Sequence, residues 1–329
     1  MKTSAVKTVL CTFVLVLMTL AGSSAYSLDS HNECRANPND PHSPGIVMLR
    51  GKYQGRCMDT SFKRAVKVLS LERDLLTISN YRKGGKFYTA EIPLQDLEKV
   101  SYIVVDLNSK PINAGGLINI SHTELRFKFK HKDSIRLLPQ DPSDRTLTDG
   151  DLVISYNYMA PQGVEYSPVK GFDEDLYGAV LQFFSMEDEV KTRFVDQKVN
   201  AYEMALSVRP SQAIKILVHA AQDSQKMGYA SAYDTWTNNC TTKLYDILDA
   251  ALSLKTAPYR FSTKRIGDTG MAPGILALGK RGLLASDSRV TLVNSEFGYK
   301  RLSSWSGHYF DYWLGKTYQD VQNTFWVRK

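Results

Sequence analysis

The sequence predicts an α+β fold, with an antiparallel sheet formed mainly by the first half of the chain and helices formed mainly by the second. Short β-branched and aromatic segments of alternating polarity dominate up to about residue 158. From Asp173 onward the apolar residues recur mostly at helical spacing. Because the strands come first and the helices follow in a separate run, the order favours α+β over an alternating α/β fold.

The most regular strand signal covers residues 117–130. Because side chains on a strand point alternately to its two faces, one face of this strand is expected to pack on the core while the other stays polar. A second strand over residues 151–158 follows an Asp-Gly turn signal, and we expect it to pair with the first in an antiparallel manner. The apolar face carries Leu125, Phe127 and Phe129, and the polar face carries His122, Glu124, Arg126, Lys128 and Lys130.

The remaining elements follow from composition and spacing. Residues 102–107 are β-branched and aromatic, which predicts a strand, and residues 202–208 are expected to be extended. The aromatic tail after Trp305 is expected to pack into the core rather than to contact acyl chains. Helices are expected over residues 58–78, 176–184, 187–195 and 211–225, and from Cys240 onward, followed by a short apolar segment over 272–285.

The N-terminus has the pattern of a secretory signal. Residues 1–25 combine an early positive charge, an apolar stretch and small residues at the expected cleavage site. We expect an N-terminal extension over residues 26–99, a main domain over 100–290 and an aromatic tail over 291–329. The formal net charge of +7 suits an anionic surface such as lipid headgroups, and solvated surface lysines are the commoner alternative. Basic residues are not interleaved with aromatic ones in a run, so the sequence does not support nucleic-acid binding.

Three cysteines follow the expected signal peptide. Cys34 and Cys57 are close in sequence within a region rich in Gly, Pro and Asn, and an exported compartment permits disulfides. We therefore expect a disulfide between Cys34 and Cys57, which leaves Cys240 unpaired. A disulfide from Cys240 to either of the other two remains an alternative.

Cys240 is the candidate nucleophile. Asn238 or Asn239 is suited to cap the following helix, which places Cys240 in the first turn. Free N–H groups and the positive end of the helix dipole lie there, and both favour the thiolate over the thiol. The alternative is a small buried hydrophobic residue, which is the commoner role of a free cysteine.

A cysteine nucleophile needs a base, and His122 is the candidate among six histidines. His122 lies on the polar face of its strand, after a Gly-Gly pair that would let a substrate backbone approach. The other five lie in less suitable places: the polar N-terminal arm (His31, His42), the opposite strand parity (His131), a helix with apolar neighbours (His219) and the aromatic tail (His308).

A third polar group should orient the base. We favour Asn157 on the neighbouring strand, because a neutral amide can fix an imidazole without forcing its charge; Glu124, Ser155 and Asp151 remain alternatives. Arg126 shares the polar face and is expected to bind a substrate carboxylate or phosphate, unless it forms a structural ion pair with Glu124 or another acidic residue. Asn239, beside the sulfur, is also predicted to contact substrate.

Neither a metal nor an organic cofactor is expected. The sequence contains no Cys-x-x-Cys, His-x-x-x-His or His-Glu-x-x-His pattern and no Gly-rich phosphate loop. Two glycosylation sequons, at Asn119 and Asn239, lie next to the candidate catalytic residues, where a glycan would block the site. This placement fits export from a bacterium rather than a eukaryotic secretory route.

Three segments resemble a known bacterial envelope family. Residues 120–127, Ile-Ser-His-Thr-Glu-Leu-Arg-Phe, are similar to its Gly-His-Thr-Phe-Leu-Arg-Phe strand, although Glu124 stands where the family often has an aromatic residue. Residues 233–242 resemble its second signature, an aromatic run that ends in Asn-Cys-Ser/Thr, and residues 273–284 are similar to a third feature. The family is the N-terminal periplasmic domain of a lipoprotein N-acyltransferase, and the resemblance covers roughly residues 100–290.

This resemblance implies a permuted papain-like, NlpC-related thiol fold in which the histidine strand precedes the cysteine helix. It also implies Cys240 as nucleophile and His122 as base, in acyl transfer or hydrolysis on lipid or lipoprotein acyl groups, with peripheral membrane contact. A peptidoglycan amidase or peptidase of the same fold is one alternative, with a cell-wall substrate. The other is a non-catalytic envelope binding module in which Cys240 is buried or disulfide-bonded.

Overall fold

The computed structural model describes residue 34 and residues 44–107, 121–165, 176–235, 237–254, 271–302 and 307–326. The expected signal peptide lies outside these residues, and the chain from Cys34 onward forms one unit. Its strands are β1 Lys67–Leu71, β2 Leu75–Lys83, β3 Lys86–Pro93, β4 Leu97–Asp106, β5 Ser121–Phe129, β6 Ile135–Pro139, β7 Leu147–Asp149, β8 Asp151–Met159, β9 Tyr177–Ser185, β10 Asn200–Ala205, β11 Ala232–Tyr233 and β12 Thr291–Leu292.

Helices follow or interrupt these strands. A short 3-10 turn, η1 Leu94–Asp96, precedes β4, and a π-helix, η4 Lys191–Asp196, directly continues α2. The α-helices are α2 Met186–Val190, α3 Pro210–Met227, α4 Cys240–Ala251, α5 Met271–Lys280, α6 Val293–Glu296, α7 Gly307–Trp313 and α8 Tyr318–Trp326. None of the helices in the described segments is long and apolar enough to cross a bilayer.

All the named strands join one mixed sheet. The order along it is β12-β10-β4-β5-β8-β9-β2-β3-β6-β7, with β1 added to β2 and β11 added to β9. The pairs are antiparallel except for β2 with β9, which is parallel. The expected antiparallel pairing of β5 with β8 is confirmed, as is the α+β class.

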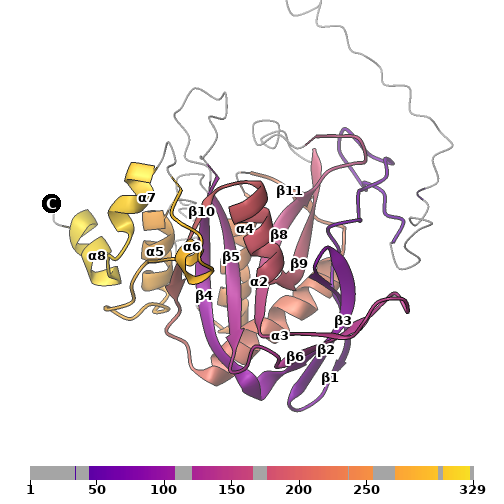
Figure 1. Cartoon of the computed structure of the whole chain (residues 1–329). Helices are drawn as coiled ribbons and strands as arrows, with labels where there is room; N and C mark the ends of the chain where they lie inside the picture. Colours follow the sequence, from indigo (N-terminus) through magenta and orange to yellow (C-terminus); the bar gives the residue numbers. More distant parts are fainter. Residues whose placement is uncertain are drawn as a thin grey trace, which may run out of the picture. The chain divides into compact units, whose positions relative to one another are not determined.

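Helices cover both faces of the sheet where β5 and β8 pass (Figure 1). On one face, Leu125 and Phe127 of β5 share a core cluster with Leu217 of α3 and Leu244 of α4. On the other face, a smaller cluster joins strand residues to α2, the π-helix and α6; its members include Ile103, Val105, Val153, Met186, Phe194 and Val293. The two faces of β5 therefore meet different helices, and this arrangement decides which groups surround His122.

Two expected helices are wrong. The segment expected to be helical over residues 176–184 instead belongs to β9 (177–185), in which all nine residues are buried. A central strand that is covered on both faces carries apolar residues without alternation, so its pattern is easily mistaken for that of a buried helix. Residues 58–78 contain no helix either; β1 and the start of β2 form an antiparallel hairpin there, in which Leu69 and Leu71 are exposed.

The remaining elements agree with expectation. Strands β4 and β10 overlap most of the segments expected to be extended, α3 and α4 account for two expected helices, and α2 and the π-helix account for 187–195. The apolar segment at 272–285 begins with α5. In the tail, Phe310, Trp313 and Val321 are buried in the main core cluster, whereas Tyr312 is exposed.

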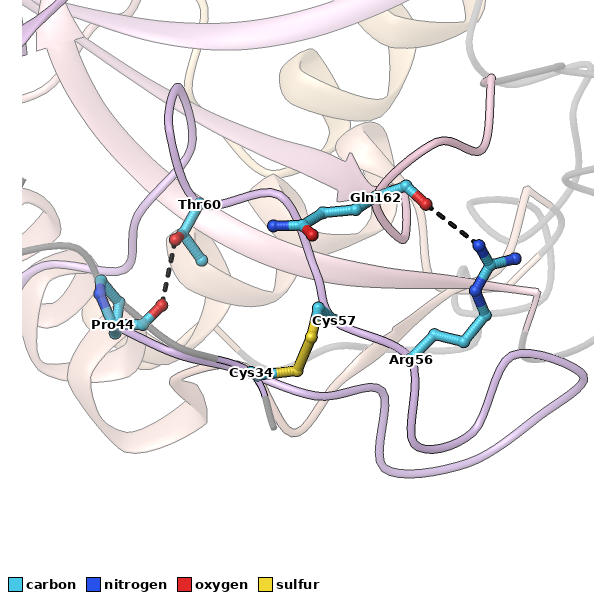
Figure 2. Close-up of a disulfide and its surroundings, with 6 residues drawn as sticks. All are labelled: Cys34, Pro44, Arg56, Cys57, Thr60 and Gln162. Carbon is cyan, nitrogen blue, oxygen red and sulfur yellow. Dashed lines mark hydrogen bonds between the residues drawn. A yellow bond between two sulfur atoms is a disulfide. The ribbon is translucent and has the colours of Figure 1, made fainter. Parts of the chain in front are cut away.

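The expected disulfide between Cys34 and Cys57 is confirmed (Figure 2). Beside it, Arg56 Nη2 donates to the carbonyl oxygen of Gln162 at 3.2 Å, and Thr60 Oγ1 donates to that of Pro44 at 3.1 Å. The segment closed by this disulfide therefore lies beside the residues that follow β8. Residues 67–93, which we expected in an extension, form β1–β3 of the main sheet, so the structure has no boundary at residue 100.

Candidate active site

Cys240 is the first residue of α4, and its position is fixed by a capping box. Asn239 Oδ1 accepts the backbone N–H groups of Thr241 and Thr242 at 2.9 and 3.0 Å. In return, Thr242 Oγ1 accepts the N–H of Asn239 at 2.9 Å. Reciprocal bonds of this kind satisfy otherwise unpaired donors at a helix start and hold the first turn in place.

This cap uses the whole Asn239 side chain. Its amide nitrogen donates to the carbonyl of Thr235 at 2.8 Å, and the residue is 3% exposed. Both polar atoms of this buried side chain make hydrogen bonds within the protein, so the geometry favours a capping role over the expected substrate contact. Its contribution to the site is to place the sulfur.

His122 lies near the start of β5, on the face opposite α4. Its cross-strand neighbour is Val105, which belongs to the smaller core cluster. Helix α4 contacts both β5 and β8 from the other side of the sheet. The side chain of His122 therefore points to the face of the sheet opposite to the one that α4 covers.

The thiol and the imidazole meet where β5 and β8 stop pairing. The β5–β8 ladder covers only residues 125–128 and 151–154, so the start of β5 lies beyond it. There the backbone N–H of Thr123 bonds to the sulfur of Cys240, and the imidazole of His122 bonds to the same sulfur. The end of the ladder is thus the place where the helix terminus reaches the strand.

The environment of Cys240 favours its thiolate. Burial alone would raise the pKa of the thiol, but the charge and the hydrogen bond of His122, with further hydrogen bonds from Thr123, lower this pKa to about 6. Cys240 is the one free cysteine among the described residues and is 3% exposed. A thiol with this pKa is largely ionised at pH 7, which is the form that attacks a carbonyl.

The Nε2 nitrogen of His122 contacts two polar side chains. Nε2 lies 2.7 Å from Ser155 Oγ and 3.2 Å from Oε1 of Glu124. These two contacts occupy Nε2, which leaves Nδ1 for the sulfur. Both partners were among the alternatives that the sequence offered for the orienting group.

The favoured candidate, Asn157, lies one step further away. Its amide nitrogen donates to Ser155 Oγ at 3.0 Å and to Gln182 Oε1 at 2.9 Å rather than to the ring. Asn157 thus acts on His122 only through Ser155. Asp151, the remaining alternative, bonds to Arg126 instead.

Two charged residues near Glu124, Arg193 and Glu189, were not predicted from the sequence. Arg193, in the π-helix, donates from Nη2 to Glu124 Oε1 at 3.1 Å and from Nε to Glu189 Oε1 at 2.6 Å. Burial raises the pKa of Glu189 to about 7, although Arg193 opposes the shift. Glu189 and Arg193 are four residues apart on a polar helical segment, a common spacing of surface ion pairs, so nothing in the sequence marked them as neighbours of His122.

Arg126 is occupied by acidic side chains. The residue is fully buried; it forms a bidentate pair with Asp151, and its Nη1 lies 2.7 Å from Glu296 and 3.3 Å from Glu203. The structure therefore favours the ion-pair alternative over the expected substrate contact, although the partners do not include Glu124. This network ties α6 and β10 to the central strands.

A cavity of about 460 Å3 lies at the far end of β8. Its walls include Phe62, Lys63, Tyr158 and Val164. The carbonyl of Phe62 accepts a hydrogen bond from Gln182 Nε2 at 3.1 Å, and Gln182 is the residue that holds Asn157. Tyr158 is three residues beyond Ser155, or roughly 10 Å along an extended strand.

Comparison with known families identifies the chain at this point. Residues 87–266 match the family model of the Lnb N-terminal periplasmic domain, a match that includes both His122 and Cys240. The match spans more than half of the 329 residues, and the chain belongs to this family. Because the family is defined by a periplasmic domain, the chain is an exported protein of the bacterial envelope. No curated protein and no solved structure matches the chain.

Proposed function

We propose that this protein is a cysteine-dependent enzyme that transfers or hydrolyses acyl groups in the bacterial cell envelope. The observation that carries the proposal is the pairing of Cys240 with His122 at a helix start, which lowers the pKa of the thiol to about 6. A purely structural cysteine gains nothing from an ionised sulfur. Cys240 is the nucleophile of the proposed enzyme and His122 its base.

The proposed reaction has two halves. His122 takes the thiol proton, and the sulfur of Cys240 attacks the carbonyl carbon of an ester, forming a C–S bond and an oxyanion. The backbone N–H of Cys240, at the positive end of α4, is placed to stabilise that oxyanion. When the C–O bond breaks, the imidazolium returns the proton to the departing alcohol. An amine or a water molecule then attacks the thioester, with His122 taking its proton, and releases the sulfur.

The proposed substrates are acyl esters of lipids or lipoproteins. The resemblance of residues 120–127 and 233–242 to the family signatures supports this class. The cavity beside Tyr158 adds support, because Phe62, Tyr158 and Val164 give it an apolar part that suits the hydrocarbon of an acyl donor, next to charged side chains such as that of Lys63. We also infer the permuted papain-like topology, for which the order of the histidine strand before the cysteine helix is the support.

Intact-mass spectrometry tests the proposal. The purified native protein is incubated with phosphatidylglycerol vesicles and, separately, with a synthetic diacylglyceryl lipopeptide. We expect a mass increase of one acyl chain on the native protein and on a His131→Ala control, since His131 is exposed and lies outside the site. Cys240→Ala should form no adduct, and His122→Ala should form it at least a hundredfold more slowly.

Three outcomes would contradict the proposal. Identical adducts on the native protein and on Cys240→Ala would place the acyl group elsewhere. Release of stem-peptide fragments from purified cell wall, with no acyl adduct from either lipid, would favour the peptidoglycan amidase instead. A folded protein whose Cys240 resists thiol titration would favour the binding module.

A further inference from the structure

The cavity at the far end of β8 is lined by two segments that hydrogen bonds join. Its wall consists of residues from 59–63 and from 158–165. The N–H of Gln162 donates to the carbonyl oxygen of Cys57 at 2.8 Å, next to the disulfide of that cysteine. The cavity is therefore a fixed part of the fold. Its first segment precedes residue 87, where the match to the family model begins, so family membership assigns no role to that segment.

Lys63 is the cation among the described residues of this wall. Its Nζ donates to the carbonyl oxygen of Tyr158 at 2.8 Å and lies 3.5 Å from the centroid of the Tyr158 ring. No carboxylate in the described part of the chain forms an ion pair with it, since Asp59 accepts from Ser61 instead and Glu165 is exposed. A partly buried ammonium whose close partners are neutral gains most from an anionic ligand.

The charges around Lys63 favour an anion as well. Burial lowers the pKa of Lys63 to about 7; the charges of Arg193 and Arg82 act in the same direction, and that of Asp59 opposes them. Both arginines are already paired with buried carboxylates, whereas Lys63 lines the cavity. An anion in the cavity would therefore favour the charged form of Lys63 and form a salt bridge with it.

Apolar side chains adjoin the amine. Phe62 is 59% exposed although it is a large hydrophobic residue, and Val164 and the ring of Tyr158 continue the wall. The volume of about 460 Å3 lies within the range of small-ligand pockets. A negative charge beside hydrocarbon is what a phospholipid presents at the boundary between its headgroup and its acyl chains.

We propose that this cavity binds the phosphodiester headgroup of an anionic phospholipid, with Lys63 paired to the phosphate and Phe62 and Val164 against the hydrocarbon. The proposal rests on the acyl-transfer function inferred above and names the headgroup of its acyl donor. The site lies beyond Ser155 on β8, so the headgroup is held apart from the sulfur that receives the acyl group.

Isothermal titration calorimetry with dihexanoyl phosphatidylglycerol, a water-soluble lipid, tests the assignment. The full chain is used in a Cys240→Ala background, which prevents turnover. Lys63→Met should weaken binding at least tenfold, whereas Lys63→Arg, which keeps the charge, should stay within about threefold of the parent. Lys67→Met is the matched control, because Lys67 is exposed on β1 and lies outside the cavity wall; its affinity should not change.

Two further ligands separate the phosphate from the hydrocarbon. Dihexanoylglycerol, which has no phosphate, should bind at least tenfold more weakly than the lipid and equally to the parent and to Lys63→Met. Glycerol 3-phosphate, which has no acyl chain, should also bind at least tenfold more weakly than the lipid. Equal binding of the lipid and glycerol 3-phosphate would make this a site for free phosphate and overturn the lipid assignment.

The pH dependence of binding separates a ligand contact from a structural role of the amine. Affinity for the lipid should fall about tenfold from pH 6 to pH 8.5, because the amine loses its proton over this range while the phosphodiester keeps its charge. Lys63→Arg should show a flat profile. The groups that face Lys63 are the same in both proteins, so the difference reports Lys63 itself; they are Asp59, Arg82, Tyr158, Glu165 and Arg193.

The assignment is overturned if Lys63→Met keeps the parent affinity, if dihexanoylglycerol binds as tightly as the lipid, or if the parent and Lys63→Arg show the same pH profile. If Lys63→Met does not fold, Lys63→Gln is judged by the same criteria. Acyl adducts on Cys240 separate the two proposals. Lipid binding that depends on Lys63 without any adduct on the native protein would overturn the enzyme, whereas adducts that form at the native rate in Lys63→Met would overturn only the headgroup site.

Discussion

The Nε2 atom of His122 lies 2.7 Å from the hydroxyl oxygen of Ser155, although the ladder between their two strands ends before it reaches either residue. The side chains bridge a stretch that the backbones leave unpaired. One nitrogen of the imidazole thus bonds to a residue of the sheet, and the other faces the sulfur of Cys240 at the start of α4. The orientation of the base follows from where β5 and β8 separate.

Ser155→Ala should slow acyl-enzyme formation more than Asn157→Ala does. Ser155 contacts the ring directly, whereas Asn157 contacts only Ser155. Loss of one orienting hydrogen bond is expected to cost about tenfold in rate, and loss of the outer one less. Single-turnover rates of thioester formation measure both. A larger loss for Asn157→Ala would return the orienting role to the amide.

Arg126→Met should destabilise the fold by about 3–5 kcal/mol, because it leaves the carboxylates of Asp151, Glu203 and Glu296 without their shared cation. Lys128→Met is the matched control. Lys128 pairs with the same Glu296, but its side chain is 34% exposed, so its loss should cost about 1 kcal/mol or less. Urea unfolding gives both values. A folded Arg126→Met of native stability that no longer binds an acyl donor would instead support a substrate contact.

Glu189 should make the protein less stable as the pH rises from about 4.5 to 7. Burial raises the pKa of Glu189 to about 7 in the folded protein, above the value of about 4.3 for an unfolded chain. Between these values the folded state binds more protons, so the free energy of unfolding falls as the pH increases. Glu189→Gln stays neutral throughout.

The measurement is the free energy of unfolding of Glu189→Gln minus that of the native protein, obtained by urea unfolding at several pH values. This difference should grow in favour of the variant from pH 4.5 to pH 7 and then level off. A difference that stays constant over this range would show that Glu189 titrates normally.

The local parts of the site were predictable from the sequence. Alternation placed His122 on the polar face of β5, and an Asn before an amphipathic run placed Cys240 in the first turn of α4. Both signals depend only on neighbouring residues. The pairing of Cys34 with Cys57 likewise followed from their nearness in the chain.

The rest depends on tertiary structure. The sequence placed Ser155 and Asn157 on the correct strand, but their order of contact with His122 depends on where the β5–β8 ladder ends. Arg193 reaches Glu124 from the helical segment that follows β9, with Glu189 paired to Arg193, and no local pattern encodes that approach. Strand β9 was mistaken for a helix because burial on both faces removed the alternation that would have marked it.

The most direct test of the Cys240–His122 pair is the pH dependence of Cys240 alkylation in the native protein and in His122→Ala. The structure predicts a native midpoint near pH 6, because the imidazole lowers the pKa of the thiol to about 6. Without the imidazole, burial should drive the midpoint above 8.5, the value of an unperturbed cysteine. His131→Ala should keep the native profile. A native midpoint near 8.5 that His122→Ala leaves unchanged would contradict the pairing and, with it, the proposed enzyme.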